Sequence, residues 1–339
     1  MPLEGASWFL RPTLAYRYTT YQVDDELVRL ARVAKSPSRS VPIASVDAGL
    51  YFDRAANLGG KSYLQTLEPR VFYLYTPFRN QGNFPVFDTS ALTFSWGQLF
   101  RDSRYTGADR QNDANQLTMA LSSRLLRQDD GKEKLAVSFG QILYFNDSRV
   151  SLPGSNTTIQ QGKSAWIADA NYMLNDRWTM GATYQWDPKY RRKDLASFRT
   201  RYLLPGDGII NVSYRFRRDL LEQTDVSVLY PINPTWSLVG RHYYSLEDSK
   251  PLEIIAGVQW DSCCLAVRAL ARRYVRNREG DLDTAFQVEF VLKGLSSLGQ
   301  DTDRVLRRAI LGYNRDDLYL VPPSNTTTDP DDYDPNLIP

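Results

Sequence analysis

Apolar and polar residues alternate along segment after segment of this chain. In the clearest segment, 177–187, every second residue from Trp178 to Trp186 is apolar or aromatic, and the residues between them are polar or glycine. Successive side chains of a β-strand point to opposite faces of the sheet. Each such segment therefore predicts a strand with one apolar face and one polar face.

The alternation predicts about fifteen strands, most of them as long as a tilted strand that crosses a bilayer. Soluble antiparallel sheets also alternate. Aromatic residues at the segment ends and arginines on the polar side favour instead an all-β, antiparallel transmembrane β-barrel with lipid outside and water inside. The predicted strands are 7–21, 41–53, 63–75, 90–97, 116–126, 134–146, 164–174, 177–187, 195–203, 209–217, 224–230, 235–245, 252–260, 263–273 and 283–293.

Composition agrees with a barrel and argues against other classes. The 339 residues are enough for a large barrel, and the net charge of +2, with basic residues spread along the chain, argues against nucleic-acid binding. Mean hydropathy is −0.44, and no apolar run approaches the ~18 residues of a spanning helix. The 21 Tyr and 7 Trp suit the membrane–water boundary.

From residue 164 onward the connections alternate between tight turns and longer polar loops. Barrels of this type have short periplasmic turns and longer outer loops, so the tight turns are expected in the periplasm. The tight turns are 175–176, 205–208, 232–234 and 261–262, and the longer links are 188–194, 218–223, 246–251 and 274–282. Upstream the order is unresolved, because 76–89 and 98–115 are both long.

The sequence offers no catalytic or metal constellation. His242 is the one histidine; its register points it outward, whereas Ser237 and Ser245 face the lumen. A hydrolase needs Ser and His on one face, within reach of each other. One His and two Cys also argue against a zinc site. We expect neither enzymatic activity nor a cofactor or metal, and we interpret His242 as an interfacial aromatic residue.

The polar face is expected to line the lumen. It can be a solvated channel wall with compensating ion pairs, or a docking wall for an anionic amphiphile or a plug protein, and the sequence does not separate the two. The charged residues assigned to it are Asp47, Glu68, Arg70, Arg124, Asp169, Arg199, Arg201, Arg215, Arg217, Asp225, Arg241, Glu253, Arg268, Arg272 and Glu289.

Cys263 and Cys264 are the most specific local feature. Vicinal cysteines rarely bond each other, because the small ring is strained. They can be two small apolar residues that open a strand. Their position after the tight turn 261–262 places them instead at the oxidising, periplasmic end, with disulfide partners elsewhere.

The chain resembles the C-terminal barrel of the LptD family, the outer-membrane proteins that assemble lipopolysaccharide (LPS) in Gram-negative bacteria. The resemblance spans about residues 40–300, and it is the order of the matching blocks that makes it specific. The blocks are Leu67-Glu68-Pro69-Arg70 with 73–75, Arg104-Tyr105-Thr106-Gly107-Ala108-Asp109-Arg110 with 113–118 and 122–124, Gly140-Gln141 with 144–145, Ser262-Cys263-Cys264 with 266–268, and 292–299.

The resemblance implies a 26-stranded barrel plugged by a lipoprotein such as LptE. It also implies an N-terminal periplasmic domain that receives LPS from periplasmic bridge proteins. We expect this chain to lack that domain, whose two cysteines would bond Cys263 and Cys264. The last strand, within 283–293, would form one side of a lateral seam for LPS. We expect weak pairing there near Phe286, Gln287, Val288, Glu289 and Phe290, a pattern that also suits barrel-insertion machinery.

The predicted organisation is a barrel portion, 1–298, followed by a tail, 299–339. The tail contains a short helix within 302–311 and a loose acidic end, 329–335. An odd strand count does not suit a bacterial barrel. Met1 to Gly5 also lack the features of a signal peptide. We therefore expect this chain to be part of a longer protein.

The predicted function is non-enzymatic transport and assembly of LPS in the outer membrane. A general or substrate-specific porin is the alternative, and it predicts ion conductance without a lipoprotein plug. A soluble β-rich binding protein is the third possibility, and it predicts solubility without detergent.

Overall fold

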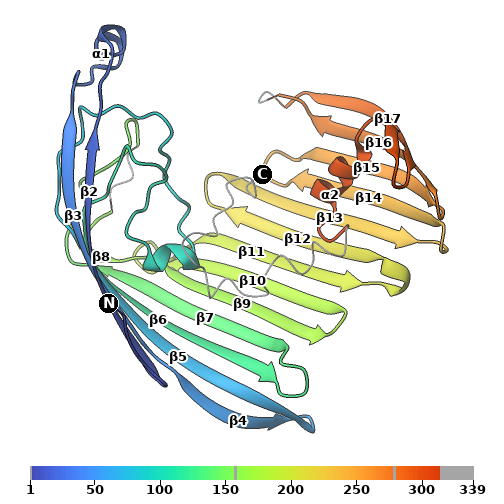
Figure 1. Ribbon diagram of the computed structural model, residues 1–339, viewed down its shortest axis with the longest axis horizontal. Coiled ribbons are helices and arrows are strands. Elements are labelled where there is room, and N and C mark those ends of the chain that lie inside the picture. Colours follow the sequence, from blue (N-terminus) through green and yellow to red (C-terminus); the bar gives the residue numbers. More distant parts are fainter. Residues whose placement is uncertain (1, 156–158, 278–279, 314–339) are drawn as a thin grey trace. The chain divides into compact units, whose positions relative to one another are not determined.

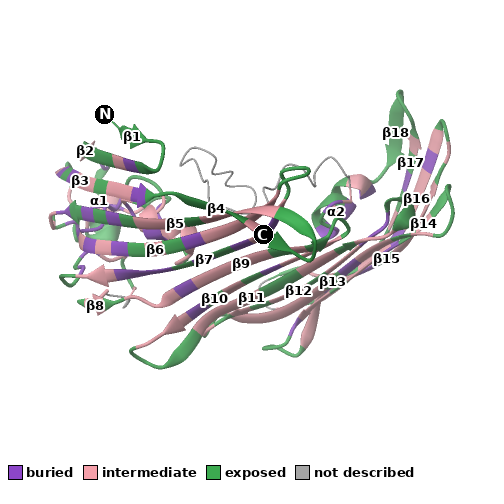
Figure 2. Ribbon diagram, turned by 90° about the horizontal axis from the view of Figure 1, so that it is seen from below, coloured by how far each residue is buried: buried purple, intermediate pink, exposed green. Residues whose placement is uncertain are grey.

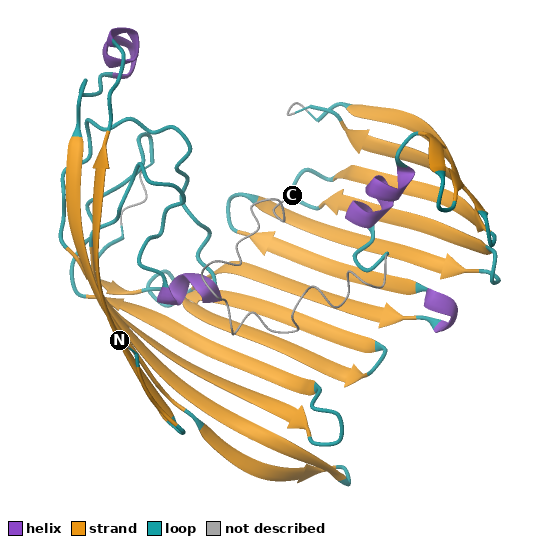
Figure 3. Ribbon diagram, viewed as in Figure 1, coloured by secondary structure: helices purple, strands orange, loops and turns teal. Residues whose placement is uncertain are grey.

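The computed structural model describes residues 2–155, 159–277 and 280–313. Those residues form 18 strands, two α-helices and two short 3-10 helices, and the strands belong to one antiparallel sheet (Figure 3). The all-β, antiparallel prediction is confirmed. Neither described α-helix, of seven and eight residues, is long enough to cross a bilayer.

The chain divides into two compact units. Unit 1 contains Met1–Asp169 and Trp186–Arg192, and unit 2 contains Ala170–Gln185 and the described residues from Lys193 onward. β9 (Trp166–Asn175) and β10 (Trp178–Asp187) each contribute residues to both units.

Unit 1 is built from long neighbouring strands and one long connection (Figure 1). Its strands are β1 (Leu3–Gly5), β2 (Trp8–Thr20), β3 (Ser38–Leu50), β4 (Phe52–Leu58), β5 (Lys61–Thr76), β6 (Ala114–Arg127), β7 (Glu133–Tyr144) and β8 (Gly162–Lys163), with α1 (Asp25–Ala31) and the 3-10 helix η1 (Trp96–Phe100). Residues 77–113 connect β5 to β6.

Unit 2 is a regular antiparallel meander in which strands follow chain order (Figure 1). It contains β11 (Arg192–Leu203), η2 (Pro205–Asp207), β12 (Ile209–Arg217), β13 (Leu221–Pro231), β14 (Trp236–Ser245), β15 (Lys250–Asp261), β16 (Leu265–Val275), β17 (Leu282–Leu292), β18 (Ser296–Gly299) and α2 (Thr302–Ala309). Exposed and less exposed residues follow one another along these strands, as the alternation predicts (Figure 2).

The segment 90–97 was wrongly predicted as a strand. Ala91 makes only an isolated bridge with Tyr105, and η1 begins at Trp96. The apolar side chains of Phe94 and Trp96 pack against a buried cluster that includes Ile142 of β7, so their spacing reflects a local core. Residues 77–113 are thus one long connection between β5 and β6. With that connection undivided, long and short connections alternate in the first half of the chain as well.

Four strands were missed. β1, β8 and β18 have two to four residues, too few for an alternation test, and β4 pairs with β5 from Phe52 to Leu58. The expectation that the strands end within 283–293 is also wrong for the described residues. A turn at Gly294, with φ 80°, returns the chain as β18, which pairs with Glu289–Leu292 of β17.

The tail helix expected within 302–311 is present as α2. Asp301 caps it, because its side chain accepts a hydrogen bond from the Arg304 N–H. Leu306 and Ile310 are fully buried against apolar residues of β12, β14, β15 and β16. The expected acidic end, 329–335, lies outside the described residues.

Candidate functional site

The strands of unit 2 have two chemically different faces. We call the face that carries α2 the polar face of unit 2; Asn211, Asp225, Arg241, Glu253 and Arg268 lie on it. The opposite, apolar face exposes hydrophobic side chains; examples are Val212, Val226, Leu238, Phe286 and Phe290. Hydrophobic exposure on this scale marks a surface that contacts lipid or another apolar partner.

A chain of ion pairs crosses four strands on the polar face of unit 2, from β13 to β16. Arg241 of β14 lies 2.5 Å from an Asp225 oxygen and 2.6 Å from a Glu253 oxygen. Glu253 in turn lies 2.6 Å from Arg272 of β16. Arg241 and Glu253 were predicted on this face, and each charge in the chain has an opposite neighbour. This part of the surface is therefore electrostatically compensated.

A second group of charges ties α2 to β16 and β17. Arg268 lies 3.1 Å from a Glu289 oxygen and 3.3 Å from an Asp303 oxygen. The Thr302 hydroxyl, at the start of α2, donates to Glu289 at 2.5 Å. Glu289 is 5% exposed, so its charge depends on these partners.

The residues after α2 continue along the same face. The Asn211 amide donates to the Leu311 carbonyl at 3.0 Å, and the Gln259 amide donates to the Tyr313 hydroxyl at 2.9 Å. The apolar side of this helix follows from its sequence, whereas the strands on which it packs do not. α2 and residues 310–313 thus cover part of the polar face of unit 2.

The arginines of β11 and β12 differ from those of β14–β16. Arg199 donates to the Asn171 side chain at 2.8 Å, and Arg201 donates to the Asn211 side chain at 3.2 Å. Within the described part of the chain, Arg199, Arg201, Arg215 and Arg217 have no carboxylate in ion-pair range. The polar wall predicted from the sequence therefore contains compensated and uncompensated arginines.

The charges predicted in unit 1 also meet on one face of its strands. Arg70 forms a bidentate pair with Asp47, at 2.8 and 2.6 Å, and its guanidinium lies 3.8 Å from the ring centre of Phe100 in the 77–113 connection. Arg124 lies 3.5 Å from Glu68. We call this the polar face of unit 1. The 77–113 connection packs on it through Phe100, which contacts a buried cluster that includes Phe72 and Leu74 of β5.

The 77–113 connection has its own buried polar core, which the sequence analysis did not identify. Asp109 accepts hydrogen bonds from the Tyr21 hydroxyl at 2.7 Å and from the Phe87 and Asp88 N–H groups. Burial would raise the pKa of Asp109, but these donors together hold it below its usual value. Burial, together with the bond to Asp109, raises the pKa of Tyr21 to about 12.

Two further residues fix this connection to its neighbours. Arg39 donates to the Asp109 carbonyl at 3.0 Å and to the Ala108 carbonyl at 2.6 Å. Asp113 accepts from the Ser148 hydroxyl and from the Arg149 N–H in the segment that follows β7. Arg39 contacts the 104–110 block, and Asp113 belongs to the 113–118 block. The blocks that carry the family resemblance therefore include residues that hold this connection in place.

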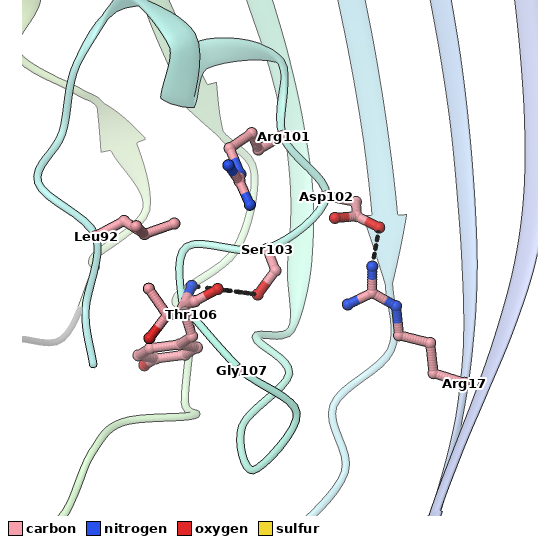
Figure 4. A pocket seen from close by; sticks show the side chains of 8 residues that line it. Arg17, Leu92, Arg101, Asp102, Ser103, Thr106 and Gly107 are labelled. Atoms are coloured by element: carbon pink, nitrogen blue, oxygen red, sulfur yellow. Dashed lines mark hydrogen bonds and ion pairs between the residues drawn. The ribbon is translucent and has the colours of Figure 1, made fainter. Parts of the chain in front are cut away.

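A cavity of about 270 Å³ lies within the same connection (Figure 4). Arg17, Arg101, Ser103 and Thr106 are among its lining residues. Arg17 is neutralised by Asp102 at 2.6 Å, and the Ser103 hydroxyl bonds the Tyr105 backbone. These groups are engaged in holding the connection together.

β17 pairs to different extents with the strands on its two sides. β17 pairs with β16 along all eleven of its residues, whereas β18 covers only Glu289–Leu292 of its other edge. The Gln287 side-chain oxygen is buried without a hydrogen-bond partner among the described residues. Glu289, by contrast, is firmly held. Any weakness in pairing is therefore on the β18 side.

The two cysteines lie between β15 and β16 and are exposed and free. Their sulfurs are 3.0 Å apart, and this contact raises the pKa of the Cys264 thiol. They lie at the same strand ends as the tight turns 205–208 and 232–234 of unit 2. The position is accessible to a partner from outside the chain.

The structure places His242 on the apolar face of unit 2. His242 stacks on Tyr244, with ring centres 5.7 Å apart, and pairs in register with Val226 of the apolar face. Within residues 2–155, 159–277 and 280–313, no three His, Cys, Asp or Glu side chains form a group that could hold a metal ion.

Comparison with known proteins gives a consistent family. A family model described as LPS transport system D matches residues 1–236. Proteins named LPS-assembly protein LptD match the whole chain in Xanthomonas oryzae at 69% identity, Xanthomonas campestris at 70% and Xylella fastidiosa at 64%. In each case the match covers 44% of the relative, so the chain spans less than half of these proteins' length.

Solved structures add little. A ferric enterobactin receptor of Pseudomonas aeruginosa aligns with 86% of this chain and 53% of its own, at 9% identity and a TM-score of 0.38. That score is too low to support an inference.

Proposed function

The chain belongs to the LptD family, and we propose that it forms part of an integral outer-membrane barrel that delivers LPS to the outer leaflet. The activity is that of a full-length family member carrying this chain, hereafter the full-length protein. The observation that supports the proposal is the family membership itself, over the whole chain. The alternative of a general porin has no support among the relatives.

The two faces suit such a transporter physically. Moving an anionic sugar headgroup through hydrocarbon is very costly, because charge is poorly stabilised in a low-dielectric medium. A polar face turned to a lumen gives the headgroup a hydrated path, while the exposed apolar face contacts lipid. In this proposal the polar face of each unit is the one in contact with water.

The proposal includes a seam and a plug. The acyl chains would leave beside the last strands, where β17 has an edge that β18 covers only in part. A lipoprotein such as LptE would fill the lumen, and periplasmic bridge proteins would supply LPS through the remainder of the full-length protein. Residues 1–298 would then be barrel and 299–339 a tail, with α2 inside the lumen.

A depletion experiment tests the function. The full-length protein is depleted in its native cell, and newly made, isotope-labelled LPS is followed to the cell surface. We expect LPS to accumulate in the inner membrane and to reach the surface again when the wild-type protein is restored. Unchanged delivery during depletion, together with large ion conductance of the purified barrel, would favour the porin.

A further inference from the structure

Arginines on the polar face of unit 2 fall into two groups. On β14 and β16, Arg241, Arg268 and Arg272 each lie within 3.3 Å of a carboxylate oxygen. On β11 and β12, four arginines have no such partner among the described residues. We call Arg199, Arg201, Arg215 and Arg217 the arginine patch.

Strand register brings the arginine patch together. Arg215 lies opposite Ser197, and Arg199 lies opposite Ser213, so Arg199 and Arg215 are diagonal neighbours on adjacent strands. Such neighbours have Cα atoms about 7–8 Å apart. Arg217 and Arg201 extend the patch by two residues on either side. Arg199, Arg215 and Arg217 are exposed, and Arg201 is half-buried.

Local contacts position two of the side chains. A Cβ at Gly181 would lie 2.6 Å from the Arg199 Nε, so the glycine leaves room for the Arg199 side chain. Asn211 accepts from Arg201 and donates to the Leu311 carbonyl. Asn211 therefore links one edge of the patch to the backbone at Leu311.

Four like charges in this arrangement repel one another. No carboxylate among the described residues offsets that cost, whereas carboxylates on β13 and β15 compensate Arg241 and Arg272. An anion from outside the chain would remove that repulsion. Guanidinium groups bind phosphate through two parallel N–H bonds, which makes arginine better suited than lysine for this ligand.

We propose that the arginine patch is a binding site for the phosphate groups of a phosphorylated glycolipid headgroup. This inference rests on the proposed function and assigns one step of the path to β11 and β12. Three of the four arginines lie opposite small polar residues, Ser197, Ser213 and Asn211, whereas Arg217 lies opposite Leu195. The small polar residues leave room for a hydrated sugar phosphate between the guanidinium groups.

The test uses the full-length protein with its lipoprotein, purified in detergent and titrated calorimetrically with phosphorylated core oligosaccharide released from LPS. We expect Arg199→Gln/Arg215→Gln to weaken binding about tenfold or more, since two charge-assisted contacts are lost. Arg199→Lys/Arg215→Lys should bind with intermediate affinity, because charge remains without the bidentate geometry. Dephosphorylated oligosaccharide should bind weakly to every variant.

The matched control is Arg273→Gln/Arg276→Gln, which removes the same charge elsewhere. Arg273 pairs in register with Ile254 of the apolar face, and Arg276 follows β16. This control should bind within about twofold of wild type, and all variants should have the thermal melting profile of the wild type.

Four results would overturn the proposal. The first is wild-type affinity in the Arg199→Gln/Arg215→Gln protein. The second is equally tight binding of inorganic phosphate, which would indicate a free-phosphate site. The third is loss of the lipoprotein with unchanged oligosaccharide affinity, which would make the patch a protein contact. The fourth is a loss of oligosaccharide affinity in the Arg273→Gln/Arg276→Gln control as large as the loss in the Arg199→Gln/Arg215→Gln protein. Normal LPS delivery by the wild type would leave the proposed function standing in each case.

Discussion

Single residues decide how charge is used in this chain. Glu289 is buried on β17 and is held by Arg268 and Thr302, so it serves to join α2 to the sheet. Arg199 and Arg215 lie on the same face and have no carboxylate partner in the part of the chain that the structure describes. An arginine thus stabilises the fold at position 268, whereas the arginines at positions 199 and 215 remain available to a ligand.

Tyr21 gives a prediction for alkaline pH. Its pKa is about 12 in the folded protein, against about 10 for an unperturbed tyrosine. A raised pKa means that the stabilising bond to Asp109 is fully present below about pH 10 and is lost as the pH rises through about 12. We expect the 77–113 connection to become accessible to protease over that window.

The measurement is the ultraviolet titration of wild-type protein minus that of Tyr21→Phe. The difference should show one phenol that ionises near pH 12. A difference curve centred near pH 10 would contradict the assigned environment of Tyr21.

At the scale of elements, strands were the most predictable feature. β12 has the predicted bounds, 209–217, and β14 differs from its prediction by one residue. A two-residue period is strict, so any segment of nine or ten residues records which face each side chain occupies. The assignment of His242 to the apolar face and of Arg241 to the polar face follows from that rule.

Connections and tertiary contacts were less predictable. The conformation of residues 77–113 depends on backbone N–H groups that donate to Asp109 and on an apolar cluster at η1. Neither feature produces a periodic pattern in the sequence. For the same reason, the sequence identified arginines on the polar face but not which of them have carboxylate partners. Pairing depends on which strands are neighbours and on where α2 packs.

Helix α2 yields a prediction about local stability. Leu306→Ala removes a fully buried side chain from its contact with β12–β16 and should destabilise the docked helix by about 2–5 kcal/mol. The Leu311→Ala control, at a 49% exposed position, should cost less than about 0.5 kcal/mol. Amide hydrogen exchange in α2 measures both, and equal protection in the two variants would show that α2 is not held by this core.

At the scale of the whole molecule, Cys263 and Cys264 are where this chain would join the rest of the family's length. They are exposed and free at a tight turn, and the family resemblance implies cysteine partners in an N-terminal domain. We expect the full-length protein to migrate differently on non-reducing and reducing gels. Cys263→Ser/Cys264→Ser should abolish that difference. An unchanged mobility pattern would remove the proposed disulfides.

The central claim is that the polar face carries the LPS headgroup. The most direct measurement places a photo-reactive amino acid in the full-length protein at Ser213 on the polar face, or at Val212 beside it on the apolar face, in living cells. We predict that LPS is captured at position 213 only while LPS transport is active, and that capture at 212 does not depend on transport. Gln259 is a second polar-face position for the same probe. Normal LPS delivery without LPS capture at either 213 or 259 would contradict the account.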